Sequence, residues 1–87
     1  MALIGVIASC PDKGYDYISS EKGCKPNFGT WEACAQFCAD HDPCFRWTWN
    51  LDTNECCTIL KDNYQGRTKN ENMVSGIWTC TSEHDWQ

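Results

Sequence analysis

The sequence has no cluster of positive charge and no long apolar run. Its seven Lys and Arg residues are scattered along the chain, and the twelve Asp and Glu residues bring the formal net charge to −5. Nucleic acids, heparin-like polyanions and anionic membranes are bound by basic faces, so the composition argues against all three as partners. No apolar stretch approaches the ~20 residues that a transmembrane helix needs, and we expect no membrane insertion.

The sequence also lacks a recognisable catalytic or metal-binding arrangement. Hydrolysis by a side-chain nucleophile needs a base and a group that orients this base, whereas His41 and His84 are merely flanked by acidic residues. No Cys-x-x-Cys pair is present, which argues against the usual redox motif and against zinc knuckles. As an alternative to disulfides, a metal ion could be bound by three residues at equal spacing, which are Cys38, His41 and Cys44. The turn at 52–55 is too short for a calcium-binding loop. We expect no enzymatic activity, no cofactor and no metal.

Cysteine, in contrast, is abundant. Eight cysteines in 87 residues are typical of a disulfide scaffold, and their even number allows complete pairing. A single domain of this size removes only about 60 % of its unfolded surface from water, so its core alone leaves it marginally stable. Disulfides supply the missing stability and form in oxidising compartments. We therefore expect one secreted or extracellular domain.

The stretch between Cys34 and Cys57 predicts a helix followed by a hairpin. Thr30 is a suitable N-cap, and the helix is expected over about 31–41, because Pro43 ends it. Four residues of this segment share one helical face, and they are Trp31, Cys34, Ala35 and Cys38. Both helical cysteines are therefore expected to point at whatever the helix packs on.

After Pro43 the apolar period becomes two, which predicts a strand. One strand face contains Phe45, Trp47, Trp49 and Leu51, and the other contains Cys44, Arg46, Thr48 and Asn50. We interpret the aromatic row as core rather than as a ligand platform. Turn residues at 52–54 lead into a second strand over 55–61. Adjacent strand residues face opposite ways, so Cys56 and Cys57 are expected to bond to different parts of the protein.

The flanking segments are less regular. A strand is expected within 15–20 and another over 73–80, where Gly76 is expected to have a packing reason. Residues 1–9 are interpreted as a first edge strand or a linker remnant, and 81–87 as a C-terminal linker. The polar stretch 62–72 is predicted to be a long exposed loop.

This predicted loop, together with Lys61 directly before it, contains our candidate ligand-binding residues. Charged groups there flank an aromatic side chain that need not be buried, and such residues either bind a ligand or simply keep the loop soluble. The candidates are Lys61, Asp62, Tyr64, Arg67 and Lys69.

The cysteine pattern resembles that of the PAN/apple domain family. The matching features are Cys10, the Cys-x3-Cys-x5-Cys series of Cys34, Cys38 and Cys44, a cysteine of the 56–57 doublet ahead of Leu60-Lys61, and Ser75-Gly76 shortly before Cys80. The resemblance spans residues 10–80. Two cysteines depart from the family pattern, namely Cys24 and one member of the doublet.

The resemblance implies an α+β module, with one helix packed across a curved antiparallel sheet. It implies bridges from Cys10 to Cys80, from Cys38 to Cys44, and from Cys34 to the doublet, which leaves a fourth bridge from Cys24 to the doublet. We favour Cys57 as the partner of Cys34, because Cys57 shares a strand face with Ile59, and assign Cys56 to Cys24.

The resemblance further implies a non-catalytic binding function. The chain is most similar to the apple domains of apicomplexan, Eimeria-type microneme adhesins, which implies secretion through a microneme-type organelle and tandem copies in the parent protein. The implied role is host-cell attachment through a host-surface protein, a partner adhesin or a glycan. The alternatives are a galactose-type lectin module and a regulatory apple domain of a plasma-type serine protease zymogen.

Overall fold

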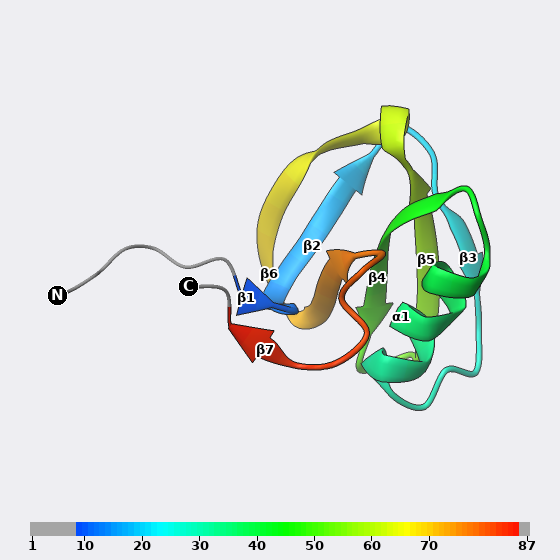
Figure 1. Cartoon of the computed structure of the whole chain (residues 1–87). Coiled ribbons are helices and arrows are strands. Elements are labelled where there is room, and N and C mark those ends of the chain that lie inside the picture. Colours follow the sequence, from blue (N-terminus) through cyan, green and yellow to red (C-terminus); the bar gives the residue numbers. More distant parts are fainter. Residues whose placement is uncertain (1–8, 86–87) are drawn as a thin grey trace, which may run out of the picture.

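A computed structural model describes residues 9–85 of the 87 and shows an antiparallel sheet of five strands. Across this sheet the order is β2 (Asp12–Ser19), β6 (Tyr64–Ile77), β4 (Cys44–Asn50), β5 (Glu55–Leu60) and β3 (Gly23–Lys25). The remaining elements are the helix α1 (Trp31–Asp40), the 3-10 helix η1 (Lys61–Asn63), and a two-stranded sheet of β1 (Ser9–Cys10) and β7 (His84–Asp85). The sheet curves, and α1 lies across β4 and β5, which confirms the expected α+β architecture (Figure 1).

The helix follows the sequence prediction closely. It begins at Trp31, where the Thr30 hydroxyl caps it by accepting a hydrogen bond from the Ala33 amide at 3.1 Å. It ends at Asp40, one residue before the expected end. Its buried residues are the four predicted ones, Trp31, Cys34, Ala35 and Cys38. The indoles of Trp31 and Trp47 stack with 5.6 Å between ring centroids, so this helix face packs directly on β4.

The central strand β4 confirms most of the predicted aromatic row. Trp47 is fully buried and Trp49 nearly so, whereas Phe45 is half-buried and Leu51 is 46 % exposed. A register irregularity between Cys44 and Arg46 interrupts the alternation at Phe45. Only the two tryptophans of the row therefore contribute to the buried core.

The prediction of an exposed loop over 62–72 is wrong. Most of this stretch belongs to β6, which pairs with β2 over 64–69 and again at Val74 and Ser75, and with β4 over 73–77. Its side chains are polar and largely exposed on both faces, so the sequence lacks the apolar alternation that identifies a half-buried strand. Backbone hydrogen bonds to β2 hold the segment in place, and the sequence pattern does not reveal them.

Four disulfides connect these elements. The Cys10–Cys80 and Cys38–Cys44 bridges agree with the implied pairing, whereas the other two bridges are Cys34–Cys56 and Cys24–Cys57. The described cysteines are all paired, and this number of disulfides indicates a secreted or extracellular protein.

Our assignment of Cys57 to Cys34 and of Cys56 to Cys24 is therefore wrong. Cys56 lies opposite Trp49 in the β4–β5 register and so shares the face on which the helix packs. Cys57 lies directly opposite Cys24 on β3, with 4.0 Å between their Cα atoms. Ile59 is buried on the face away from the helix, so sharing a face with Ile59 directs Cys57 away from Cys34.

The ends of the described chain lie together. The Cα atoms of Cys10 and Cys80 are 5.7 Å apart, and β1 pairs with β7 through Ser9 and Asp85. β7 lies within the stretch that we expected to be a linker. The rest of the N-terminal segment for which we expected an edge strand lies outside the described residues. Among the described helices, none has the length and apolar character of a membrane span.

Candidate ligand-binding surface

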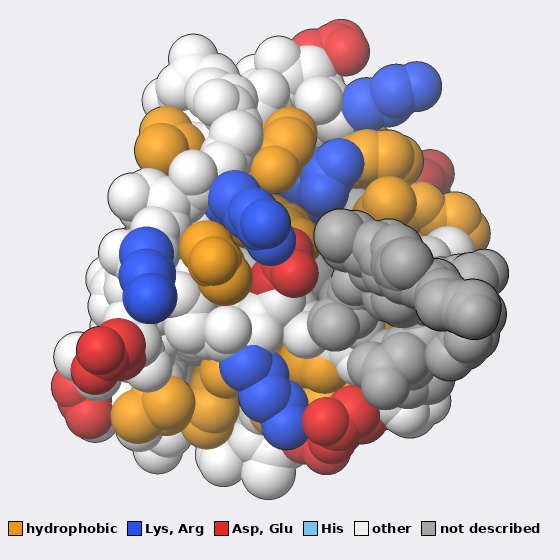
Figure 2. All heavy atoms as spheres, turned by 90° about the vertical axis from the view of Figure 1, so that its left-hand side faces the viewer, with side chains coloured by type: hydrophobic (Ala, Val, Ile, Leu, Met, Phe, Trp, Pro, Cys, Tyr) orange, Lys and Arg blue, Asp and Glu red, His pale blue; other side chains and the backbone are white. Residues whose placement is uncertain are grey.

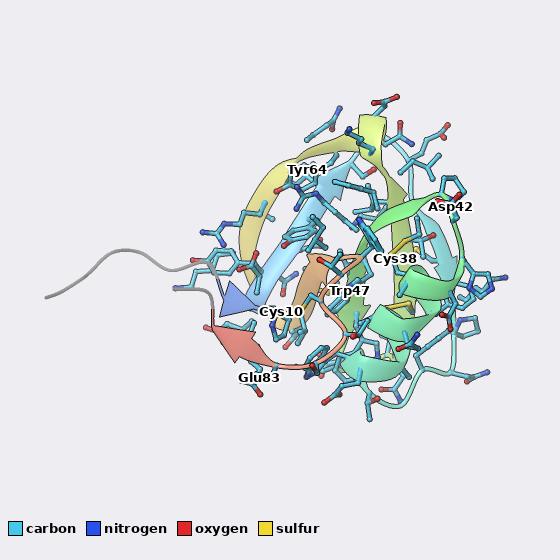
Figure 3. The ribbon with its side chains drawn as sticks, viewed as in Figure 1. Cys10, Cys38, Asp42, Trp47, Tyr64 and Glu83 are labelled. Carbon is cyan, nitrogen blue, oxygen red and sulfur yellow. A yellow bond between two sulfur atoms is a disulfide. The ribbon has the colours of Figure 1, made fainter. Side chains whose placement is uncertain are left out.

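The sheet face opposite α1 bears a connected set of cationic, aromatic and acidic side chains. Trp47 points at the helix, so Arg46 and Thr48 point away from it, as the strand period predicts. We call the connected set the cation–aromatic cluster, and its members are Arg46, Tyr64, Tyr17, Asp12, Arg67 and Tyr15. Strands β4, β6 and β2 supply these residues. Figure 3 labels one of them, Tyr64, at the start of β6.

One end of the cluster is a stack on the Arg46 guanidinium. Its central carbon lies 3.8 Å from the ring centroid of Tyr64, 5.3 Å from that of Tyr17 and 5.4 Å from that of Phe45. The Tyr17 and Tyr64 rings meet edge to face at 5.2 Å. Such contacts of a cation with aromatic faces are attractive and strengthen where water is excluded. The three rings therefore restrict the movement of the guanidinium.

The other end of the cluster centres on Asp12. One carboxylate oxygen accepts a hydrogen bond of 2.7 Å from the Tyr17 hydroxyl, and the other accepts one of 3.1 Å from Arg67. The Arg67 guanidinium also lies 4.2 Å from the ring centroid of Tyr15. Arg67 is 49 % exposed, whereas Asp12 is 22 % exposed. Asp12 thus links a buried tyrosine to an arginine at the surface.

Tyr17 has a strongly perturbed pKa. Its burial, followed by its hydrogen bond to Asp12 and the negative charge of that carboxylate, raises the pKa of Tyr17 well above its ordinary value. The phenol therefore stays protonated and keeps donating to Asp12 throughout the physiological pH range.

This shift predicts a loss of stability in alkali. Above the ordinary tyrosine pKa of about 10, the unfolded chain releases a proton that the folded chain retains, so the free energy of unfolding falls by about 1.4 kcal/mol per pH unit. Urea unfolding at pH 8 and pH 11, with disulfides intact, measures this fall. Tyr17→Phe has no such proton, and its stability is expected to fall less over this interval. An equal fall in both proteins would contradict the assignment.

The structure brings only some of the predicted ligand-binding residues together. Tyr64 and Arg67 belong to the cluster, and the Lys61 ammonium lies 5.9 Å from the Phe45 ring centroid, beside the Arg46 stack. Lys69 is exposed and lies opposite Tyr15 in the β2–β6 register. Asp62 is exposed in η1 and forms no ion pair with any residue that the structure describes.

Sequence reasoning missed the other cluster members, which are Arg46, Tyr17, Asp12 and Tyr15. The strand period did place Arg46 on the face away from the aromatic row, which was the available signal for that residue. The three β2 residues are distant in the sequence from their partners on β6, and the pairing of β2 with β6 brings them together. Figure 2 shows this side of the molecule, where Lys and Arg side chains alternate with apolar and acidic ones.

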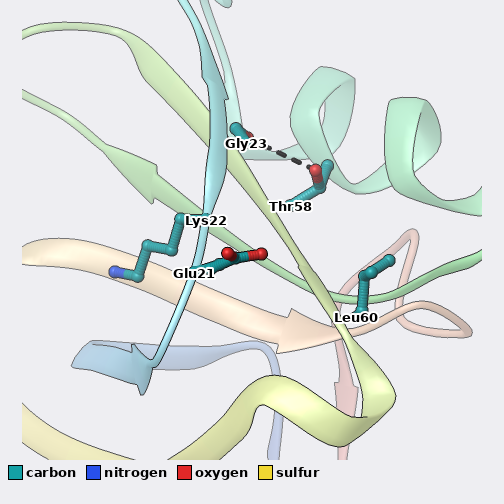
Figure 4. Close-up of a pocket in the computed structure, with 5 residues that line it drawn as sticks. All are labelled: Glu21, Lys22, Gly23, Thr58 and Leu60. Carbon is teal, nitrogen blue, oxygen red and sulfur yellow. Dashed lines mark hydrogen bonds between the residues drawn. The ribbon is translucent and has the colours of Figure 1, made fainter.

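A concave region lies elsewhere, along the edge formed by β3 and β5. One hollow of about 560 Å³ is lined by Glu21, Lys22, Gly23, Thr58 and Leu60 (Figure 4). A neighbouring hollow of about 290 Å³ extends to the C-terminal end of α1, where Phe37 and His41 line it. Both are open to solvent, and neither contains a residue that we predicted as ligand-binding.

The alternative metal set is excluded by the disulfides. Cys38 and Cys44 bond to each other, so their sulfurs are not free thiolates. Cys24, Glu55 and Cys57 also lie close together, but these two cysteines likewise share a bridge. The exposed His41 ring hydrogen-bonds the Phe37 carbonyl at 2.7 Å and packs on the Phe37 ring. The side chain of His84 lies outside the described residues.

No family model matches the chain, and no curated protein or solved structure is significantly similar to it. The geometry of the cation–aromatic cluster is therefore the main guide to function.

Proposed function

We propose that the chain is a non-catalytic binding module of a secreted adhesin, of the PAN/apple type. In this proposal it acts in host-cell attachment by contacting a host-surface protein, a partner adhesin or a glycan, and it reaches the cell surface through a microneme-type organelle. The observation behind the proposal is the cation–aromatic cluster, which is fixed by its own contacts and partly exposed on a disulfide-bonded sheet.

Fixed side chains favour recognition, because binding costs less when the groups involved are already ordered. The Asp12 carboxylate and the Tyr15 ring together hold Arg67 in place, yet about half of the Arg67 side chain remains exposed. Arginine and tyrosine are also among the residue types most enriched at energetically important positions of protein interfaces. The surface around Arg67 is therefore the part of the module that we assign to partner binding.

The closeness of the chain ends supports tandem copies in the parent protein. Because Cys10 and Cys80 are bridged, a chain entering and leaving at these residues places consecutive modules side by side, with the β2–β6 surface of each repeated. Repetition raises the effective concentration of weak sites and can increase overall affinity 10²-fold or more without new contacts.

Cell binding tests the proposal. Fluorescent tandem copies are expected to bind host cells, and Arg67→Ala is expected to weaken this binding about tenfold per module, because it removes an exposed interface arginine. The loss of its ion pair with Asp12 has little effect on folding, since exposed pairs contribute little stability. Lys25→Ala removes an exposed cation from β3, at the opposite edge of the sheet, and is the matched control.

Two outcomes would decide against this assignment. If wild type and Arg67→Ala bind cells equally well, the surface around Arg67 is not the binding surface. If wild type does not bind cells at all, the proposed adhesion function is refuted. A galactose competitor belongs in the same assay, because the partly exposed Tyr64 ring beside Lys61 and Asp62 also suits a sugar. Complete competition by galactose would favour the lectin module over protein-mediated adhesion.

A further inference from the structure

The two arginines of this chain have different partners. Arg67 forms an ion pair with Asp12, whereas the side chain of Arg46 forms no ion pair or hydrogen bond with any described residue, and its contacts are the three aromatic rings. The Nε atom of Arg46 is buried without a hydrogen-bond partner. The terminal nitrogens are also unbonded but are not among the buried atoms, so solvent reaches this end of the side chain.

The stack leaves one direction open for an acceptor. Aromatic rings contact a guanidinium through its flat face, whereas its N–H groups point outward in its own plane. An acceptor must therefore approach the edge of the guanidinium. A carboxylate fits this edge, because its two oxygens match two parallel N–H groups. Arginine also remains protonated at every physiological pH, so the site is always cationic.

Two neighbours of Arg46 define what else the ligand must offer. Lys61 lies at the same end of the sheet, beside Phe45, and forms no ion pair with the described residues. The Tyr64 hydroxyl has no hydrogen-bond partner among them either, while the ring of this residue supports the guanidinium. A ligand with a carboxylate and an adjacent hydroxyl satisfies all three groups.

We propose that Arg46, Lys61 and Tyr64 form a binding site for the carboxylate of a sugar acid at the end of a glycan. A sugar acid provides the carboxylate and the adjacent hydroxyl on one ring, whereas an aspartate or glutamate side chain provides only the carboxylate. The net charge of −5 disfavours a polyanion, and Asp62 lies next to Lys61, so the site is suited to a single negative charge. This inference rests on the proposed binding function and adds to it a second site on the same sheet, distinct from the surface around Arg67.

Nuclear magnetic resonance of the whole chain tests the site. The Nε–H signals of Arg46 and Arg67 are observed in one spectrum, and titration with glucuronate is expected to shift the Arg46 signal and not the Arg67 signal. Glucose has the same ring with a neutral group in place of the carboxylate and is expected to shift neither. Lys61→Ala, an exposed substitution that leaves the core unchanged, is expected to weaken glucuronate binding about threefold.

Substitutions of Arg46 separate charge from geometry. Arg46→Lys keeps the charge but loses the paired N–H groups, and it is expected to bind glucuronate about tenfold more weakly than wild type. Arg46→Met retains much of the packing and is expected to abolish binding, while Lys25→Ala binds as wild type does. Near-ultraviolet circular dichroism verifies the fold of each variant, and the Lys61→Ala result is independent of whether Arg46→Met folds.

Several results would overturn the inference. They are an absent Arg46 shift with glucuronate, an equal shift with glucose, and equally strong binding of acetate or of an aspartate-containing peptide. The cell-binding assay separates this failure from failure of the proposed function. If Arg46→Lys still binds cells and glucuronate does not inhibit the binding, the sugar-acid site is refuted and the proposed adhesion function stands.

Discussion

Replacing Cys10 and Cys80 together by alanine is expected to lower the free energy of unfolding by about 4 kcal/mol. Their bridge closes a loop with a sequence separation of 70, and the chain entropy that such a bridge removes from the unfolded state corresponds to about this energy. Small domains are often stable by little more than that amount, so the variant is expected to unfold near body temperature. Urea unfolding of both proteins at 25 °C measures the difference.

The Cys38–Cys44 bridge provides the matched comparison. It has a sequence separation of 6, for which the same reasoning gives about 2 kcal/mol. Replacing both of these cysteines by alanine is therefore expected to be the milder change. If the short bridge proved the more stabilising of the two, chain entropy would not be the dominant contribution of the Cys10–Cys80 bridge. Complete reduction of the four disulfides is expected to unfold the domain, and a reduced sample with a native spectrum would contradict the scaffold itself.

Gly76→Ala is the second substitution for which we expect a large effect, a loss of about 3 kcal/mol in the free energy of unfolding. A Cβ atom at this position would lie 2.6 Å from Cζ2 and 2.9 Å from Cε2 of Trp47. Trp47 is fully buried between β6 and the helix and stacks on Trp31, so its ring has little room to move. Overpacking of a dense core costs roughly 1–3 kcal/mol, and the short contact distances place this site at the upper end of that range.

A double substitution tests whether the Trp47 ring is the cause. Trp47→Leu removes the indole, so adding Gly76→Ala to it is expected to destabilise far less than adding Gly76→Ala to the wild type. Gly29→Ala is the matched control, since a Cβ atom there meets no atom within 4 Å, and it is expected to leave stability nearly unchanged. Equal losses from Gly76→Ala with and without the indole would refute this packing explanation.

The helix and hairpin were predictable because their signals are local. The Thr30 cap, the spacing of the helical cysteines and the switch to a period of two each depend on residues within a few positions of one another. Gly76 was also predicted to have a packing reason, and its contact with Trp47 confirms this, although the sequence does not name the partner.

The errors arose where a distant strand determines the outcome. Residues 64–69 look like a loop because both of their faces are polar, yet backbone hydrogen bonds to β2 make them a strand. The pairing of the cysteine doublet depends on which side of β5 the helix occupies. The strand period establishes that Cys56 and Cys57 diverge, but it does not establish which of them faces the helix.

The sequence alone determined the class of the protein. Local periodicity predicted a helix and strands, and the even cysteine count predicted a secreted, disulfide-bonded domain, because each depends on composition or on near neighbours. The α+β arrangement of one helix across a sheet was implied by the resemblance of the cysteine pattern to the PAN/apple family. The cation–aromatic cluster was decided by the tertiary structure. Arg46, Tyr17 and Tyr64 come from three strands that are distant in sequence, and only the curved sheet brings them within contact. The fold likewise decides that three aromatic rings surround the Arg46 guanidinium and that no described side chain forms an ion pair with it.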